Sequence, residues 1–428
     1  FTNFFKFFIV YSQSILTTPR LMEKMYFTEQ YLTFNSLRAH FDSLARVGYF
    51  KIVLKNRTPM RLKIHYVYRV VMWALVITYN LQHVIRARHN VDQMVDTLFI
   101  LLTTLNTLGK QVAFNIRSQR VDRVICLING PLFSANKPLH VELLKQETVI
   151  MSRILKLYQV AVFLCGALWS TYPIINRVLC EPDQFTGYFP FDTTPIVTFA
   201  IAHAYMSIVI TLQAYGNVTM DCTIVALFSQ AKTQIQMLRH NLEQLVDCTK
   251  INGQLIGSHN KQSVYKDNED ERILLQRRFV RCVEHFNAKI YLPYVKEVEA
   301  IFGEAMAVQL VVMAWVICMT VYKIVGVSAF APEFVPMAVY LACMLAQLFI
   351  YCYFGTQLKF ESELVNHSIY NCDWLSLSPR FRRQLLVMMQ YCSRPIAPRI
   401  AYIVPMSLET YITVLKHSYT LFTFLDRQ

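Results

Sequence analysis

The sequence predicts an all-α, polytopic membrane protein with seven transmembrane helices. Of its 428 residues, 54% are hydrophobic and only 16% are charged, whereas a soluble protein of this size carries roughly a quarter charged residues. Seven segments are long and apolar enough to cross a hydrocarbon core about 30 Å thick. The net charge of +14 is expected of the basic cytosolic loops of such a protein, so we expect no nucleic-acid partner.

The elements follow in a simple order. Apolar side chains within residues 1–9 share one helical face, which predicts a helix at the membrane interface. The spans lie near residues 66–85, 91–114 (with Asp92, Asp96 and Lys110 near its ends), 157–176, 193–220, 305–322, 335–358 and 402–425. The chain thus divides into 1–65 (cytosolic or interfacial), 66–220 (spans one to four), 221–300 (cytosolic), 301–358 (spans five and six), 359–400 (cytosolic) and 401–428 (the last span).

Lysine and arginine indicate which side of the membrane each loop faces. They gather before span one and between spans two and three, four and five, and six and seven, whereas Cys180–Thr194 carries three acidic residues and no basic one. This bias predicts a cytosolic N-terminus and an external C-terminus, the reverse of a G-protein-coupled receptor. Apolar periodicity in Gln234–Val246, Leu274–Phe302 and Phe381–Tyr391 predicts helices that pack beneath the membrane, and Asn252–Asp270 has the composition of a flexible loop.

The sequence shows no pattern typical of an enzyme or a metal site. The 11 cysteines lack CxxC or Cys/His spacing, so we expect reduced, mostly buried thiols and no disulfide at Cys180. No paired carboxylates and no nucleophile beside a base stand out in the spans. We therefore expect no enzyme activity, no catalytic residue, no metal and no cofactor. A transporter would show charged residues deep in its spans, and none is evident.

The last span carries one polar stripe. Ser407, Thr410, His417 and Thr420 recur at helical spacing, and Phe424 continues the line. Since lipid cannot satisfy such a stripe, it must face protein or water. The stripe alone leaves two interpretations open: the wall of a pore, or a packed helix whose hydroxyls bond to the preceding turn.

Several motifs resemble those of the insect odorant receptor family. The run Lys416–Leu425 (KHSYTLFTFL) is similar to the family's terminal signature, which ends in Ser-Tyr-x-x-Phe-Thr. Tyr351–Gly355, Glu361–Leu364 and Pro405–Thr410 follow further family elements in order, and Gly187–Asp192 resembles the Pro-Phe-Asp element before the fourth span. The short segment between spans four and five differs from the family's shared co-receptor, so the chain resembles a ligand-tuning subunit.

The resemblance implies an odorant-gated, non-selective cation channel in the plasma membrane of a sensory-neuron dendrite. Four subunits, including the co-receptor, would surround one pore as a heterotetramer. The last helix would line the pore, the cytosolic helices would form an anchor, and a small volatile apolar odorant would bind in the outer half of spans two, three, four and six. Membrane lipids and permeating cations would be the other partners. A receptor of gustatory type, or one that signals through G proteins, is the alternative.

The resemblance also directs attention to particular residues. In the four ligand-binding spans, apolar and aromatic residues share a face, Gly166 would leave room for a ligand, and His203 is the sharpest hydrogen-bonding candidate, although ordinary packing could explain any single one. The candidates are Met94, Leu98, Leu101, Phe163, Gly166, Trp169, Ser170, Phe199, His203, Met206, Met337, Tyr340 and Met344. Pore and gate candidates, with Phe424 placed to gate by dewetting, are Thr410, His417, Thr420, Leu421, Phe424 and Gln428.

Overall fold

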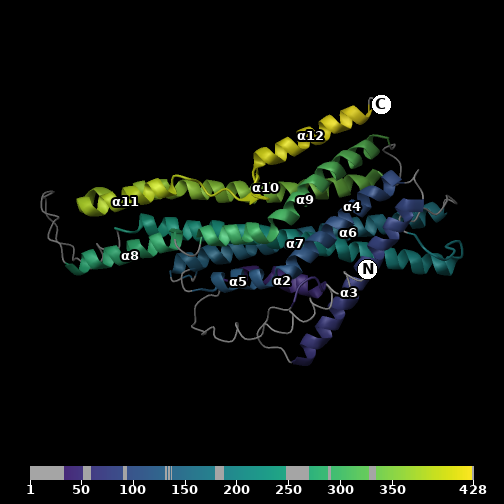
Figure 1. The fold of residues 1–428 in the computed structure, drawn as a ribbon, viewed down its shortest axis with the longest axis horizontal. Helices are drawn as coiled ribbons and strands as arrows, with labels where there is room; N and C mark the ends of the chain where they lie inside the picture. The colour runs from purple at the N-terminus through teal and green to yellow at the C-terminus, as the bar shows by residue number, and fades with distance from the viewer. Residues whose placement is uncertain are drawn as a thin grey trace.

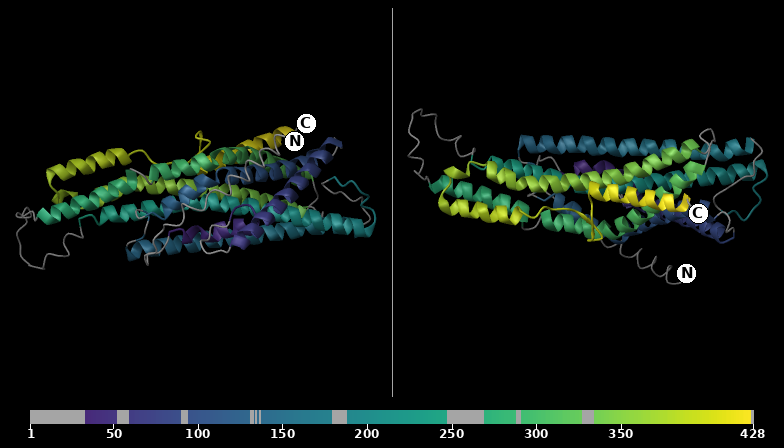
Figure 2. Two further views of the ribbon diagram at one scale, coloured as in Figure 1. Left: turned by 60° about the horizontal axis from the view of Figure 1, so that its bottom comes forward. Right: turned by 90° about the horizontal axis from the view of Figure 1, so that it is seen from above.

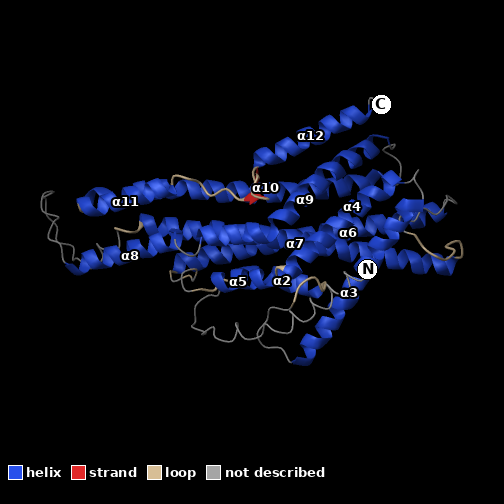
Figure 3. Ribbon diagram, viewed as in Figure 1, coloured by secondary structure: helices blue, strands red, loops and turns tan. Residues whose placement is uncertain are grey.

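The computed structural model is an elongated helical bundle in which most helices run along the long axis of the molecule (Figures 1 and 3). It describes residues 33–51, 59–89, 94–130, 133, 135, 137–178, 188–246, 269–287, 291–326 and 334–426. The elements are α2 (Asn35–Arg46), α3 (Pro59–His89), α4 (Met94–Ile116), α5 (Ser118–Ile128), α6 (Pro138–Val178), α7 (Ile196–Glu243), α8 (Glu269–Asn287), α9 (Tyr291–Gly326), α10 (Phe334–Asn371), η2 (Trp374–Ser376), α11 (Pro379–Cys392), β1 (Arg399–Ile400), β2 (Val404–Pro405) and α12 (Leu408–Asp426). The all-α polytopic membrane fold predicted from the sequence is confirmed.

The predicted spans fall in α3, α4, α6, α7, α9, α10 and α12. Over the residues that the structure describes, four of these helices, α6, α7, α9 and α10, have the length and hydropathy needed to cross a membrane. The 48 residues of α7 extend about 72 Å at 1.5 Å per residue, more than twice the thickness of a hydrocarbon core of about 30 Å. The long helices therefore extend well beyond the bilayer.

The last helix begins later than the apolar run predicts. β1 and β2 pair as a short antiparallel hairpin, and Ala401 and Tyr402 in its turn have φ angles of 49° and 63°. Pro405 offers no N–H to a helix. The Ser407 hydroxyl accepts a hydrogen bond from the Thr410 N–H at 3.4 Å, as an N-cap residue does. These features start α12 at Leu408 and not near residue 402.

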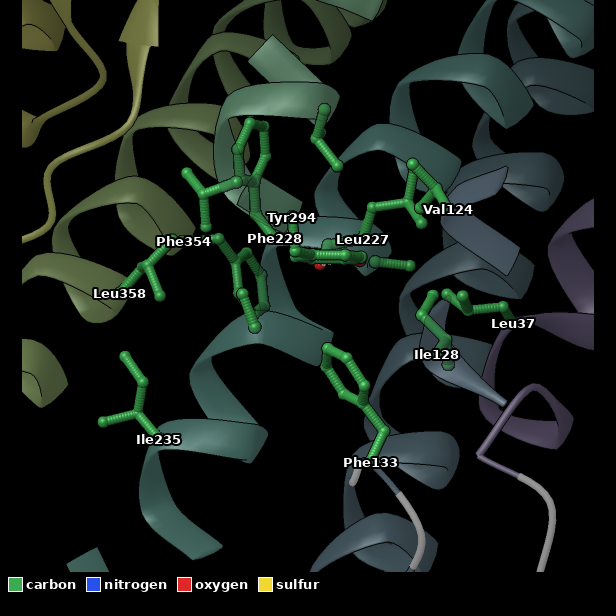
Figure 4. Packing of buried hydrophobic residues seen from close by; sticks show 14 of the residues in the cluster. Leu37, Val124, Ile128, Phe133, Leu227, Phe228, Ile235, Tyr294, Phe354 and Leu358 are labelled. Carbon is green, nitrogen blue, oxygen red and sulfur yellow. Dashed lines mark hydrogen bonds between the residues drawn. The ribbon is translucent and has the colours of Figure 1, made fainter. Parts of the chain in front are cut away.

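The main apolar core lies around the second half of α7 (Figure 4). Tyr294 of α9 is fully buried there, and its hydroxyl donates to the Leu227 carbonyl oxygen at 2.9 Å. Phe228 of α7 and Phe354 of α10 belong to the same cluster, with side chains from α2, α5, α8 and α11. The first half of α7 differs, because it exposes large apolar side chains such as Ile201. The protein thus has one tightly packed half and one half whose surface suits lipid or another subunit.

Helix α12 lies at the edge of the bundle, where it packs against α9 and α10 (Figures 1 and 2). Some predicted features lie outside the described residues. They are the interfacial helix at residues 1–9, Cys180, the loop at residues 252–268 and Gln428. The side chains of Met94, Leu98 and Phe424 are likewise not described. The nine cysteines that are described are all free thiols.

Candidate functional site

A cavity of about 130 Å³ lies between α4, α6, α7 and α10. These are the four helices that supply the candidate ligand-binding residues of the sequence analysis. An engineered apolar cavity of about 150 Å³ holds benzene, so the volume suits a molecule with about one ring. The lining residues are Thr103, Thr104, Thr107, Tyr158, Val162, Cys165, Gly166, Trp169, Ile210, Thr211, Gln213, Ala214, Asn217, Val218, Tyr340, Cys343, Met344 and Gln347.

Two aromatic side chains form one wall of the cavity. The rings of Trp169 and Tyr340 meet edge to face, with centroids 6.5 Å apart, which is a favourable arrangement for aromatic pairs. The Tyr340 hydroxyl lies 3.2 Å from the Thr103 hydroxyl. Side chains of α4, α6 and α10 therefore hold one another in place at this wall.

Two fully buried side-chain polar atoms of the lining have no hydrogen-bond partner in the described part of the chain, namely the Tyr158 hydroxyl and Gln213 Oε1. The Gln213 amide nitrogen donates to the Thr104 carbonyl oxygen at 3.0 Å, which fixes the amide and leaves its oxygen as a free acceptor. Because buried polar groups are normally hydrogen-bonded, these atoms could bind the polar group of a ligand or a water molecule.

Four candidates of the sequence analysis line this cavity: Gly166, Trp169, Tyr340 and Met344. Gly166 also serves the contact between α6 and α7. A Cβ atom at Gly166 would stand 2.6 Å from Thr211 Oγ1, closer than a non-bonded contact allows. The space that its missing side chain leaves is therefore occupied in part by Thr211, so the glycine sets the distance between two walls of the cavity.

The other described candidates lie outside the lining. Phe199 and His203 stack on each other with ring centroids 5.8 Å apart, and the Arg177 guanidinium lies 4.1 Å from the Phe199 ring centre. The Ser170 hydroxyl donates to the Gly166 carbonyl oxygen at 2.8 Å. Of the remainder, Leu101 and Met206 are buried, Met337 is half-buried and Phe163 is exposed.

Most of the polar lining residues are not among the candidates predicted from the sequence; they include Tyr158, Gln213, Asn217 and Gln347. The signal was present, because amide side chains are uncommon in apolar spans and usually face the interior of the bundle. Gln213 and Asn217 are also four residues apart, so they share one face of α7. Polar residues inside the spans therefore indicate this part of the lining, whereas aromatic and methionine stripes do not.

In α12, the polar stripe divides between two environments. Thr410 is buried, and its hydroxyl donates to the Pro405 carbonyl oxygen at 2.6 Å. His417 and Thr420 are exposed in the single chain, and Leu421 is half-buried. The Thr420 hydroxyl donates to the Lys416 carbonyl oxygen at 2.9 Å. This bond matches the packed-helix interpretation, yet the hydroxyl oxygen keeps acceptor capacity for water, so both interpretations can hold together.

The exposed face of α12 carries more polar side chains than the stripe predicted from the sequence. Glu409, Thr413 and Lys416 are exposed beside Thr420, and spacings of three and four residues place them on one side of the helix. Val414 and Ser418 point the opposite way, and the Ser418 hydroxyl donates to the Ala314 carbonyl oxygen of α9 at 3.2 Å. Helix α12 therefore packs on α9 with one face and presents a charged and hydroxyl-bearing face away from the bundle.

Comparisons with known proteins place the chain among sensory receptors. Residues 90–419 match the family model described as 7tm Odorant receptor. The chain is 21% identical over 351 residues to odorant receptor 46a, isoform B, of Drosophila melanogaster, covering 79% of this chain and 83% of that protein. It is 20% identical over 345 residues to odorant receptor Or1 of Anopheles gambiae, covering 79% and 82%. The fold resembles the olfactory receptor OR5 of Machilis hrabei in complex with eugenol, with a TM-score of 0.73, 14% identity, and 91% and 97% of the chains covered.

Proposed function

Because this chain belongs to the 7tm odorant receptor family, we propose that it is a ligand-tuning subunit of an odorant-gated, non-selective cation channel. The protein is an insect-type odorant receptor with a multi-pass membrane fold and is not an enzyme.

The cavity between α4, α6, α7 and α10 is the observation that carries the proposal. Its volume of about 130 Å³ fits a small volatile, and its aromatic and aliphatic wall favours an apolar one. The Tyr158 hydroxyl can donate to an oxygen of the ligand, and Gln213 Oε1 can accept a hydrogen bond from a ligand hydroxyl. The ligand class is therefore a compact, mainly apolar volatile with one hydroxyl or carbonyl group.

The polar face of α12 supports the channel. Glu409, Thr413, Lys416 and Thr420 are exposed in the single chain, and lipid would leave these groups unsatisfied. In an assembly of four subunits this face lines a central aqueous pore, with His417 and Leu421 beside it. In this arrangement Phe424 and Gln428, the gate candidates from the sequence, face the pore axis.

The proposal also covers the orientation of the receptor, the membrane that holds it and its partner subunit. The basic segments between spans favour a cytosolic N-terminus and an external C-terminus, in the plasma membrane of a sensory-neuron dendrite. The partner subunit is the family's co-receptor, which joins this chain in a heterotetramer through the cytosolic anchor helices. The other ligand-binding candidates from the sequence, including His203 and Phe199, remain part of the proposal. The others are Met94, Leu98, Leu101, Phe163, Ser170, Met206 and Met337.

Current recordings with a matched pair of variants test the proposal. The chain is co-expressed with the co-receptor and exposed to a panel of volatiles that includes eugenol. Val162→Trp fills the cavity, because Val162 lines it and is 7% exposed, and we expect it to abolish the odorant-evoked current. Val160→Trp, on the same helix but 65% exposed, is the control and should respond normally. An unmodified chain with no current for any volatile, or equal responses from both variants, would refute the proposal.

A further inference from the structure

A buried carboxylate lies next to the cavity and joins four helices. Asp221 of α7 accepts hydrogen bonds from Lys110 Nζ of α4 and from the Tyr351 hydroxyl of α10, each at 2.7 Å. It also accepts bonds from Gln309 of α9 at 3.3 Å and from Gln347 of α10. One side chain thus holds together α4, α7, α9 and α10.

The pair that Lys110 forms with Asp221 is shielded from water. Their side chains are 1% and 6% exposed, although the sequence predicts Lys110 near the end of a span and no charge deep in the spans. Burying two charges costs more solvation than their attraction usually returns, so such a pair is poor evidence of a stabilising role. Charged side chains that are buried together beside a cavity are more often part of a functional site.

The cavity and the ion pair share side chains. Asn217 and Gln347 line the cavity. Asn217 Oδ1 accepts a hydrogen bond from Lys110 Nζ at 2.7 Å, and Gln347 donates to Asp221. A ligand that binds to Asn217 Oδ1 or to the Gln347 amide nitrogen therefore competes with the hydrogen bonds that hold the ion pair.

A second set of contacts leads from the ion pair to α12. Gln309, which donates to Asp221, also donates to the sulfur of Met313 on α9 at 3.5 Å. Met313 belongs to an apolar cluster that includes Val414 of α12 and Met344, which lines the cavity. The carboxylate thus lies between the cavity and the helix surface on which α12 rests.

We propose that Asp221 is a positioning residue that couples occupancy of the cavity to the position of α12. The inference rests on the proposed odorant-gated channel. In the unliganded receptor, Asp221 ties Gln309 and α9 to the cavity wall. A ligand that draws Asn217 or Gln347 away from the pair loosens this tie, and α9 then releases α12 from its closed position.

Gln309→Leu is the first test, because it removes the tie to α9 without leaving a charge unpaired. Odorant concentration–response curves are recorded and normalised to the amount of receptor at the cell surface. We expect at least a threefold shift in the half-maximal concentration, or at least a threefold rise in the current without odorant. Glu147→Gln is the matched control, because it breaks another buried pair, with Lys232 at 3.1 Å, remote from the cavity lining. It should lower the surface amount only.

The double variant Lys110→Met with Asp221→Leu separates gating from folding. It removes both charges at once, so the chain can still pack. A merely structural role predicts that both the surface amount and the odorant response are normal. The proposed coupling predicts a normal surface amount with a half-maximal concentration shifted at least tenfold or with no response.

The results separate a failure of the proposed Asp221 coupling from a failure of the proposed channel. An unmodified receptor that conducts no odorant-evoked current contradicts the channel itself. An unmodified receptor that responds, together with normal curves for Gln309→Leu and for the double variant, overturns the role of Asp221 and leaves the channel in place. Additive shifts from Asn217→Leu and Gln309→Leu would also overturn it, because coupling through one carboxylate requires that their effects depend on each other.

Discussion

Gly355 offers a direct way to disturb the junction between α10 and the start of α12. Gly355 is buried in α10, and the segment before α12 passes so close that a Cβ atom there would stand 2.1 Å from the Met406 carbonyl oxygen. An ordinary contact begins near 3.4 Å. Gly355→Ala therefore forces the segment that carries Met406 to move away from α10 by about 1 Å, at a cost of about 1–3 kcal/mol.

This strain is present only while α10 and the segment before α12 are in contact. If opening moves α12 outward, the closed state bears the strain and the open state is relieved of it. A difference of about 1–3 kcal/mol between the two states changes their ratio about 5- to 150-fold. We therefore expect Gly355→Ala to raise the current measured without odorant by at least about fivefold per receptor at the cell surface.

The assay is whole-cell current with and without odorant, together with surface labelling. Gly109→Ala is the matched control, because Gly109 also lies within a helix but a Cβ atom there would meet nothing within 4 Å. That change should leave the odorant-free current as it is and slightly favour the helix. If Gly355→Ala reaches the surface with the unmodified odorant-free current, the reasoning about this junction is wrong.

Two further predictions concern the cavity and the packed half of the bundle. Gly166→Ala should raise the half-maximal odorant concentration at least tenfold, because its Cβ atom would meet Thr211 Oγ1 at 2.6 Å. Thr211→Ala in the same chain should restore most of the response. A double variant that responds as weakly as Gly166→Ala would contradict this account. Burial lowers the pKa of His40 from 6.5 to about 4, so the folded protein keeps this ring neutral. The stability that this shift provides is complete above about pH 6.5. As the pH falls from 6.5 toward 4, the free energy of unfolding decreases by about 3 kcal/mol. Thermal unfolding in detergent at pH 7 and pH 4.5 should therefore show a smaller acid destabilisation for His40→Gln than for the unmodified chain, and equal losses would refute the assignment.

The helices could be predicted from the sequence because each crossing requires a long apolar run, which composition makes visible. The start of α12 could not, because the residues from Ile400 to Val404 are as apolar as a span. A hairpin with two residues at positive φ, Ala401 and Tyr402, interrupts this apolar segment. The helix then begins after an N-cap at Ser407. Such local geometry depends on the contact with α10 and not on hydropathy.

The candidate site was predictable at the level of helices and less so at the level of residues. Trp169, Tyr340 and Met344 line the cavity, as aromatic and methionine residues of a binding site often do. Helical periodicity does not reveal which face of one helix meets which face of another, so His203 and Phe199 were chosen although they stack on each other. The burial of Lys110 depends on Asp221, which lies 111 residues away, and a single sequence does not show such pairing.

The central claim is that the exposed polar face of α12 borders a water-filled pore that an odorant opens. Thr413 and Thr420 lie on that face, whereas Leu415, which is half-buried, lies on a different side of the helix. Single cysteines at these three positions are treated with a charged, membrane-impermeant thiol reagent while odorant is present, with the unmodified chain as the control for native thiols. The account predicts that the reagent reduces the current of Thr413→Cys and Thr420→Cys and leaves that of Leu415→Cys unchanged. Block of Leu415→Cys without block of the two threonine variants would contradict it.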